Sequence, residues 1–265
     1  MAELKGPGVR RLAILQARTS SSRLPGKVLL PILGKPMLAR QIERLNRCHE
    51  IDRLIIATST DPSDDPIEAM CREAGIACYR GSLTDVLDRY VQAARPHRPV
   101  TVIRVTGDCP LADPEIIDDV IRFFEAGGYD YASNTITPTF PDGLDVEIMR
   151  FSCLEEVARE AVLPSHREHV TLFFKADTGR YRLGNLSDDV DRSHLRWTVD
   201  EPEDFEFVTR VYERLYPAKP AFTMRDILNL IEQEPALQAI NARFMRNEGA
   251  MKSRQADADY LQEHR

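Results

Sequence analysis

Short apolar runs alternate with longer segments of helical period along most of this chain. The runs that read as strands are Leu12–Gln16, Arg53–Ala57, Ile76–Tyr79, Thr101–Val105, Tyr129–Ser133, Asp145–Met149, Tyr181–Asn185 and Leu195–Thr198. The first four are apolar runs, as expected for strands that helices cover on both faces. Strands and helices that alternate at this spacing predict a mostly parallel sheet.

The segments of helical period lie between these strands. They are Pro36–Arg47, Pro66–Ala74, Leu83–Ala94, Pro114–Ala126, Phe151–Ala161, Arg167–Lys175, Glu203–Leu215 and Met224–Glu232. Pro36, Pro66 and Pro114 stand near helix starts, where the missing N–H costs nothing. The pattern therefore predicts an α/β protein in which helices cover both faces of the sheet.

The loop after the first strand combines positive charge with small residues. Arg18, Arg23 and Lys27 supply the charge, while Ser20–Ser22 and Gly26 let backbone N–H groups approach an oxygen closely. Neither a Walker A sequence nor GxGxxG is present. A solvated basic loop is the alternative interpretation. Because the loop directly follows a buried strand, we expect it to bind a polyanion such as a triphosphate.

Polar residues also follow two further strands. Ser59 and Asp61 come after the second strand, and Asp108 follows the fourth. Ligands of open parallel sheets bind beyond the carboxyl ends of the strands, and a divalent cation on a triphosphate needs one or two carboxylates. Asp108 is thus a candidate metal ligand. Its alternative role, capping the next helix, suits Asp113 better, because Asp113 directly precedes that helix.

A second acidic cluster surrounds Asp200, between the last predicted strand and a helix. From spacing alone, Asp200 caps that helix, with Glu203 completing a capping box. The order of strand and aspartate nevertheless repeats that of Asp108. Since Mg²⁺ on a triphosphate prefers two protein carboxylates to one, Asp200 is the candidate second ligand.

Asp142, Asp145 and Glu147 form a third acidic group. If a strand starts at Asp145, Asp145 and Glu147 share one of its faces. Carboxylates accept hydrogen bonds from vicinal hydroxyls, so this face suits a sugar. A solvent-facing edge strand is the plain alternative.

His166, Arg167 and His169 concentrate positive and titratable groups near a helix start. Arg167 and His169 are candidates to receive an anionic acceptor. Metal ligation by the two histidines lacks matching cysteine or acidic ligands. No nucleophile triad stands out, and in-line phosphoryl transfer needs none.

The composition and net charge of the chain limit the classes of molecule that it is expected to bind. The chain has 265 residues, 43% of them apolar, and a net charge of −7. An acidic protein of this kind is not expected to bind nucleic acid or an anionic membrane surface. No apolar stretch approaches the roughly 20 residues of a membrane span. The beginning of the chain lacks the apolar region of a signal peptide, and the five cysteines lack CxxC spacing, so we expect free thiols and a cytoplasmic location.

Several of these motifs resemble those of one enzyme family. QARTSSSRLPGKVLLPILGKPML is similar to the opening signature of the CMP-sugar synthetases, the CMP-Kdo synthetase and acylneuraminate cytidylyltransferase family. TGDCP resembles their strand-end metal motif, and TVDEPEDFEFV their second carboxylate motif. DGLDVE, REHVT and RWTVDEPED are closer to the SpsF branch of spore coat polysaccharide biosynthesis. The likeness spans roughly Leu12 to Tyr216.

The resemblance implies a Rossmann-like nucleotidyltransferase fold with a mixed sheet, CTP as donor, Mg²⁺ as cofactor and a homodimer. Arg18, Lys27 and Asp108 match catalytic positions, and Asp108 and Asp200 match the magnesium ligands. The nucleotide-binding residues that we expect are Gln16, Ala17, Arg18, Ser22, Arg23, Lys27, Ser59, Arg89 and Asp108. The expected acceptor-binding residues are Asp142, Asp145, Glu147, Arg167, His169 and Arg196.

The expected activity is Mg²⁺-dependent transfer of CMP from CTP to a sugar acid or related acceptor, with release of pyrophosphate, for surface polysaccharide biosynthesis. Transfer onto a sugar 1-phosphate and a non-catalytic nucleotide-binding protein are the alternatives. We expect residues 1–240 to form one nucleotidyltransferase domain, with an acceptor-binding or dimerisation insertion at about 130–185. Residues 241–265 are a polar tail to which the sequence assigns no chemistry.

Overall fold

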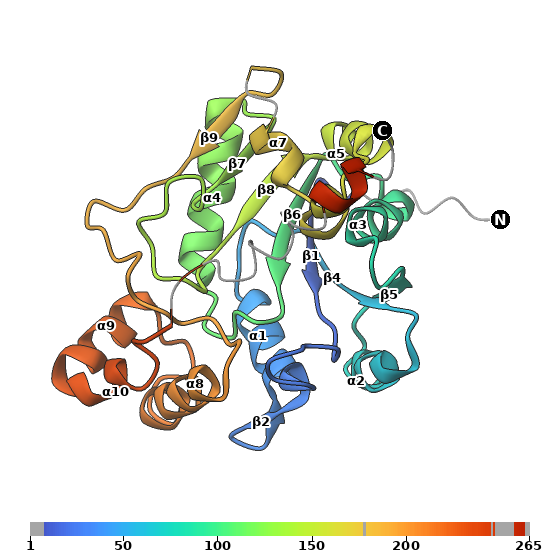
Figure 1. The fold of residues 1–265 in the computed structure, drawn as a ribbon. Helices are drawn as coiled ribbons and strands as arrows, with labels where there is room; N and C mark the ends of the chain where they lie inside the picture. Colours follow the sequence, from blue (N-terminus) through green and yellow to red (C-terminus); the bar gives the residue numbers. More distant parts are fainter. Residues whose placement is uncertain (1–7, 177–178, 245, 247–256, 263–265) are drawn as a thin grey trace.

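A seven-stranded sheet runs through the molecule (Figure 1). The computed structural model describes residues 8–176, 179–244, 246 and 257–262. In spatial order the strands are β5 (Cys78–Gly81), β4 (Arg53–Ser59), β1 (Arg11–Gln16), β6 (Thr101–Thr106), β8 (Glu147–Arg150), β7 (Tyr131–Ser133) and β9 (Leu183–Asn185). Within this sheet β8 alone runs against its neighbours. The predicted mostly parallel, mixed sheet is confirmed.

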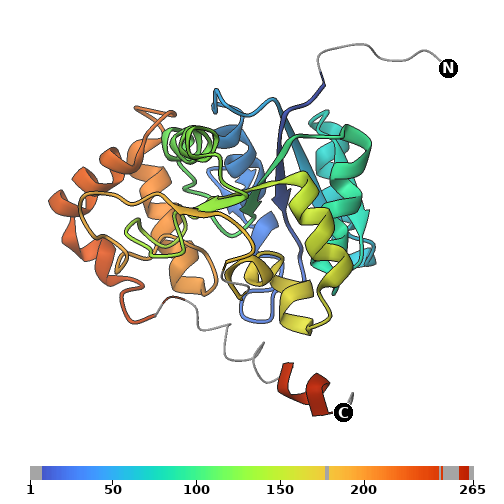
Figure 2. The ribbon, with the colours of Figure 1, turned by 90° about the horizontal axis from the view of Figure 1, so that it is seen from above.

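Helices cover both faces of the sheet, which explains why the first strands are apolar runs. In β1, Ala13 and Leu15 pack into one core, while Leu12 and Ile14 pack into the other. The first core receives α1 (Met37–Leu45), α2 (Asp65–Glu73), α4 (Pro114–Gly127), α8 (Pro202–Leu215) and α9 (Met224–Gln233). The second receives α3 (Val86–Ala94), α5 (Phe151–Glu160) and α7 (Leu172–Ala176). Figure 2 shows α3 and α5 across the strands from α4 and α8.

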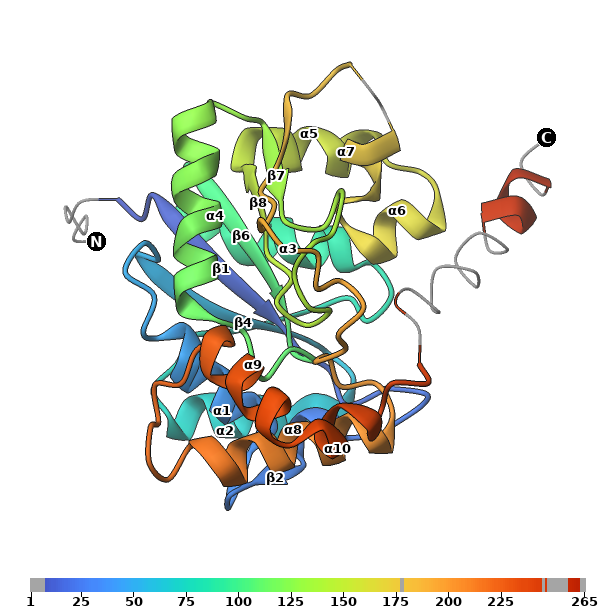
Figure 3. The same ribbon diagram turned by 90° about the vertical axis from the view of Figure 1, so that its left-hand side faces the viewer.

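Shorter elements complete the described chain. Figure 3 shows α10 (Pro235–Ala239) grouped with α8 and α9 at one end of the molecule. A hairpin of β2 (Pro31–Ile32) and β3 (Lys35–Pro36) directly precedes α1. Within the described ranges, no helix combines the length and the apolar character that crossing a bilayer requires.

Two predicted elements are wrong. The segment expected as a strand at Leu195–Thr198 forms only an isolated bridge between Arg196 and Asp142. The expected helix Arg167–Lys175 is two helices, α6 (Pro164–His169) and α7, because Val170 takes a left-handed φ of 60°. In both cases the pattern of apolar and polar residues continues although the regular backbone hydrogen bonds do not. The pattern therefore predicts a regular element where the chain is irregular.

The carboxyl ends of β1, β4 and β6 meet at one edge of the sheet. The Gly107 N–H donates to the Gln16 carbonyl at 2.7 Å, and the Ala17 N–H to the Ala57 carbonyl at 3.1 Å. A Cβ on Gly107 would lie 3.0 Å from that Gln16 oxygen, so glycine permits the close approach. The loop after β1 and Asp108, which follows β6, therefore lie next to each other.

Candidate active site

Lys27 joins the two predicted metal ligands. Its Nζ lies 2.9 Å from Asp200 Oδ1 and 3.8 Å from Asp108 Oδ2, and it donates to the Val199 carbonyl at 2.6 Å. Lys27 begins a single 3₁₀ turn (Lys27–Leu29) and is 8% exposed. Because one ammonium contacts both carboxylates, residues almost a hundred positions apart line a single charged site.

Asp200 is not the cap of α8. The N-cap is Glu201, and the capping box is completed by Asp204 rather than by Glu203. Arg23, from the first loop, lies 2.8 Å from Asp200 Oδ2. Burial would raise the pKa of Asp200, but the charges of Lys27 and Arg23 lower it below its ordinary value. Asp200 is thus an ionised carboxylate that faces the first loop.

The donor set of this site suits a hard divalent cation. Asp108 and Asp200 supply carboxylate oxygens on either side of one cationic atom, and triphosphate oxygens would supply the remaining ligands. Within the described ranges no group of three or more His, Cys, Asp or Glu is arranged to hold a metal without such help. The residues therefore fit Mg²⁺ that arrives with a nucleotide, and the cation itself stays a prediction.

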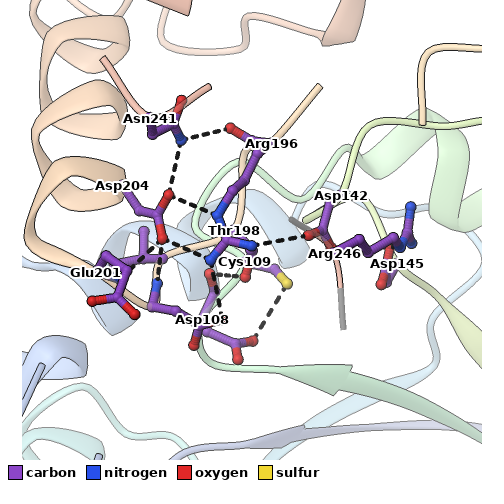
Figure 4. A network of polar contacts seen from close by, with 12 residues as sticks. Asp108, Cys109, Asp142, Asp145, Arg196, Thr198, Glu201, Asp204, Asn241 and Arg246 are labelled. Carbon is purple, nitrogen blue, oxygen red and sulfur yellow. Dashed lines mark hydrogen bonds and ion pairs between the residues drawn. The ribbon is translucent and has the colours of Figure 1, made fainter. Parts of the chain in front are cut away.

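Arg196 is the centre of a buried network of polar contacts (Figure 4). Its Nε and Nη2 each lie 2.9 Å from the carboxylate of Asp204, and it also contacts Asp200 and Asp142, at 3.4 Å each. Asn241 donates to Asp204 Oδ1 and to the Arg196 carbonyl, both at 2.9 Å. Sequence reasoning placed Arg196 in the acceptor site; the structure shows it joining Asp200 to Asp142.

Asp142 and Asp145 lie together on the same side of the network as Arg246. Neither belongs to a strand, because β8 begins only at Glu147. The solvent-facing edge strand is therefore wrong: β8 lies between β6 and β7, and Asp142 is 9% exposed. Burial, and then repulsion by Asp145, raise the pKa of Asp142 to about 7.

Replacing Asp142 by asparagine should change how stability depends on pH. Between pH 3.8 and about 7 the folded protein holds a proton on Asp142 that the unfolded chain has released, so this group lowers stability as pH rises. The free energy of unfolding of Asp142→Asn, relative to that of wild type, should therefore rise by about 2–4 kcal/mol from pH 4 to pH 8. Urea denaturation without nucleotide or cation measures it. A difference in free energy of unfolding that stays constant with pH would contradict the raised pKa of Asp142.

Gly143 lets the Asp142 loop touch the segment that carries Arg196. Its φ is +109°, and a Cβ there would lie 2.5 Å from the Thr198 backbone nitrogen. The Trp197 N–H donates to the Asp142 carbonyl at 2.6 Å across the same contact. We expect Gly143→Ala to destabilise the protein by about 3 kcal/mol, since both strain and a clash oppose it. Gly179, which has φ +114° and open space around its Cβ position, provides the control in thermal denaturation.

Glu147 points into a different, closed environment. Tyr131 and Thr171 donate to its Oε1 at 2.6 Å each, and Arg104 and Lys175 pair with it. Burial would raise its pKa, but the Arg104 charge and these bonds lower it to about 2. With every oxygen already engaged by protein groups, Glu147 braces β6, β7 and α7 against one another. We therefore give it a positioning role rather than a contact with the acceptor.

A cavity beside the β1 loop is lined by one of the residues predicted to bind the nucleotide, Arg18. Arg18 has no hydrogen bond or ion pair among the described residues, and it lines a cavity of about 430 Å³ between α3 and α6. Arg167 also lines this cavity, but it pairs with Asp85 and donates to the Ala158 carbonyl, so its guanidinium is engaged. Of these two arginines, Arg18 is the one available to a phosphate.

Three more predicted nucleotide residues lie in or beside this region. Arg89 is fully buried; it donates to the Ser82 carbonyl, while its Nε and Nη2 have no hydrogen-bond partner in the described part of the chain. Gln16 Oε1 is also buried and has no such partner among these residues. The Ser59 hydroxyl donates to Asp64, which also accepts from Thr19 of the first loop. Arg89 and Gln16 thus have unsatisfied buried polar atoms, whereas the Asp64 carboxylate joins Ser59 to the first loop.

The remaining predicted residues are placed as follows. Ala17 is buried under the first loop, and Ser22 is exposed on it. His169 ends α6, and burial lowers the pKa of its imidazole. Its backbone carbonyl accepts from Thr171, a partner of Glu147.

Sequence reasoning missed the residues that hold the site together: Asp64, Asp204, Asn241 and Arg246. Asp204 is fully buried, and its position three residues after Glu201 is the signal that was available, because a carboxylate there can close a capping box. Asn241 and Arg246 carried no usable signal, since the carboxylates that their side chains contact, those of Asp204 and Asp145, lie far away in the sequence.

Known proteins resemble this chain over most of its length. The sequence profile of the family described as cytidylyltransferase matches residues 12–238. The spore coat polysaccharide biosynthesis protein SpsF of Bacillus subtilis is 33% identical over 84% of this chain and 95% of its own. A 3-deoxy-manno-octulosonate cytidylyltransferase of Anaeromyxobacter dehalogenans is 41% identical over 43% of this chain and 47% of its own.

Among solved structures, a cytidylyltransferase from Leptospira borgpetersenii superposes with a TM-score of 0.83 at 29% identity. The alignment covers 87% of this chain and 97% of that one.

Proposed function

Because the chain belongs to the cytidylyltransferase family of CTP-dependent nucleotidyltransferases, we propose that it transfers CMP from CTP to a sugar acid or a related acceptor and releases pyrophosphate. The observation that carries this proposal is the convergence of Asp108 and Asp200 on the Nζ of Lys27. A non-catalytic nucleotide-binding protein would have no need to keep two ionisable carboxylates and a lysine at that point.

The triphosphate is held by the first loop. Arg18, Arg23 and Lys27 neutralise the β- and γ-phosphates, and Lys27 exchanges part of its contact with Asp200 for a phosphate oxygen. Asp108 and Asp200 are the residues that would hold Mg²⁺, and the bound cation would offset negative charge on the triphosphate. Arg89 and Gln16, with their free buried atoms, recognise the base side of the nucleotide.

The acceptor enters on the side of Asp142 and Asp145, which accept hydrogen bonds from its hydroxyls. Its reacting hydroxyl releases its proton to water, and the oxygen attacks the α-phosphorus in line with the bond to the β-phosphate. The new oxygen–phosphorus bond forms as that bond breaks, and pyrophosphate leaves with the bonding electrons. The cationic loop stabilises the charge that builds up on the leaving group.

A pyrophosphate-release assay tests the activity. The purified chain would receive CTP or UTP with 3-deoxy-manno-octulosonate, N-acetylneuraminate or a sugar 1-phosphate, with Mg²⁺ or with EDTA. We expect release with CTP and a sugar acid that needs the divalent cation. Release only with a sugar 1-phosphate would support an NDP-sugar synthetase instead. Binding of CTP without release for any acceptor would favour a nucleotide-binding protein.

The organisation of the chain completes the proposal. We propose that residues 1–240 act as one nucleotidyltransferase domain, in which residues of about 130–185 form the acceptor side and a dimer contact. A homodimer in the cytoplasm agrees with the resemblance to CMP-sugar synthetases. Light scattering after gel filtration measures the oligomeric state.

A further inference from the structure

Arg246 reaches the acceptor side from beyond the region that the family shares. The family profile ends at residue 238, eight positions earlier. Arg246 Nη2 nevertheless lies 2.6 Å from Asp145 Oδ1, and its Nε lies 3.7 Å from Asp142 Oδ1 (Figure 4). A side chain outside the family profile thus contacts both acids that are expected to face the acceptor.

The guanidinium of Arg246 is held firmly at one point and loosely at the others. The contact with Asp145 is short, whereas Nη1 meets the Phe140 carbonyl at 3.4 Å, at the outer limit of a hydrogen bond. The side chain is 16% exposed. A guanidinium carries five N–H donors. Asp145 orients Arg246, and the contacts with the described residues engage fewer than five of these donors, so an incoming oxygen can accept from the others.

Arg246 also reduces the repulsion between the acidic side chains on this side of the site. Asp142 and Asp145 repel each other and Asp108, and Arg246 offsets that repulsion for both acids. Arg196 also faces Asp142, but Asp204 and Asp200 already share its charge. Without Arg246, an acceptor with a negative group would meet an excess of carboxylates.

We propose that Arg246 is a specificity-determining residue that selects acceptors with a carboxylate or phosphate group. Its guanidinium binds that group, while Asp142 and Asp145 bind the hydroxyls of the same molecule. This inference rests on the proposed cytidylyl transfer for its setting, but it concerns binding of the acceptor, which can be measured without turnover.

Calorimetric titration tests the inference directly. The full chain, loaded with Mg²⁺ and a non-hydrolysable CTP analogue, would be titrated with 3-deoxy-manno-octulosonate, N-acetylneuraminate, glucose 1-phosphate and neutral mannose. For the anionic sugar that binds wild type best, we expect Arg246→Ala to raise Kd about tenfold or more, because a charge-assisted hydrogen bond is lost. Mannose binding and the Kd of the CTP analogue should stay within about twofold.

Two further variants separate recognition from a structural effect. Arg246→Lys keeps the charge and should recover most of the lost affinity. Arg243→Ala removes an arginine of the same segment that is 69% exposed and pairs with Glu203, so it should leave every Kd unchanged. Thermal denaturation of each variant checks that the fold is retained.

Each result of the titrations either supports or overturns the role of Arg246. Unchanged or tighter anion binding in Arg246→Ala would overturn the inference and would mean that Arg246 only fills the pocket. Failure of wild type to prefer any anionic sugar over mannose would overturn it as well. Selective anion binding without pyrophosphate release would sustain the inference while the proposed transfer fails.

Discussion

Asp108→Asn should lower kcat for pyrophosphate release about a thousandfold. The substitution keeps the shape of the side chain but removes the charge that, together with Asp200, holds the divalent cation on the triphosphate. Removing a single group that stabilises transition-state charge typically costs about 10²–10³ in kcat, and here a cation site is weakened as well. Steady-state assays at saturating CTP, over a range of Mg²⁺ concentrations, measure the loss.

The fold should survive this change. Asp108 is about one-third exposed, and its backbone carbonyl, rather than its carboxylate, accepts the bonds from Val199 and Thr198. Asp119→Asn, on the exposed surface of α4, is the matched control and should retain full activity. Normal turnover in Asp108→Asn would remove Asp108 from the mechanism.

Lys27→Met should lower kcat/KM for CTP by about a thousandfold. Methionine has a similar length but lacks the ammonium that faces the triphosphate and balances both aspartates. The exposed Lys35→Met, in β3, serves as the control. Retention of kcat/KM for CTP in Lys27→Met would show that this lysine balances the aspartates without touching the nucleotide.

Lys27→Met should have the opposite effect on Mg²⁺ binding to the protein without nucleotide. In wild type the ammonium competes with any cation for Asp108 and Asp200, so its removal should tighten Mg²⁺ binding in the absence of CTP. Asp108→Asn should weaken it. Calorimetric titration with Mg²⁺ alone compares the two variants, and a shift in the same direction for both would argue against a shared cation site.

The strands of the sheet could be predicted because their local sequence pattern matches their burial in the fold. Leu12 to Leu15 are four consecutive apolar residues, as a strand that is buried on both faces requires. Asp108 and Lys27 could be found for a related reason, since strand order alone brings the loops after β1 and β6 to one edge.

Prediction failed where long-range contacts decide the backbone. The segment at Leu195–Thr198 alternates like a strand, but its polar members are engaged by Asp204, Asp142 and Asn241 rather than by a ladder. Asp200 looks like a helix cap until Lys27 and Arg23 are seen to approach it from the other end of the chain. Arg196 and Asp142 are 54 residues apart in the sequence, and Lys27 and Asp200 are 173 apart, so no local window contains both partners.

Asn241, in the polar segment that follows α10, closes the network around Arg196 and Asp204. The carboxylate of Asp204 in turn accepts from the Asp200 backbone N–H. The position of Asp200 therefore depends on a segment that packs outside the sheet. A change in that segment would reach the candidate cation site through two hydrogen bonds and leave the strands undisturbed.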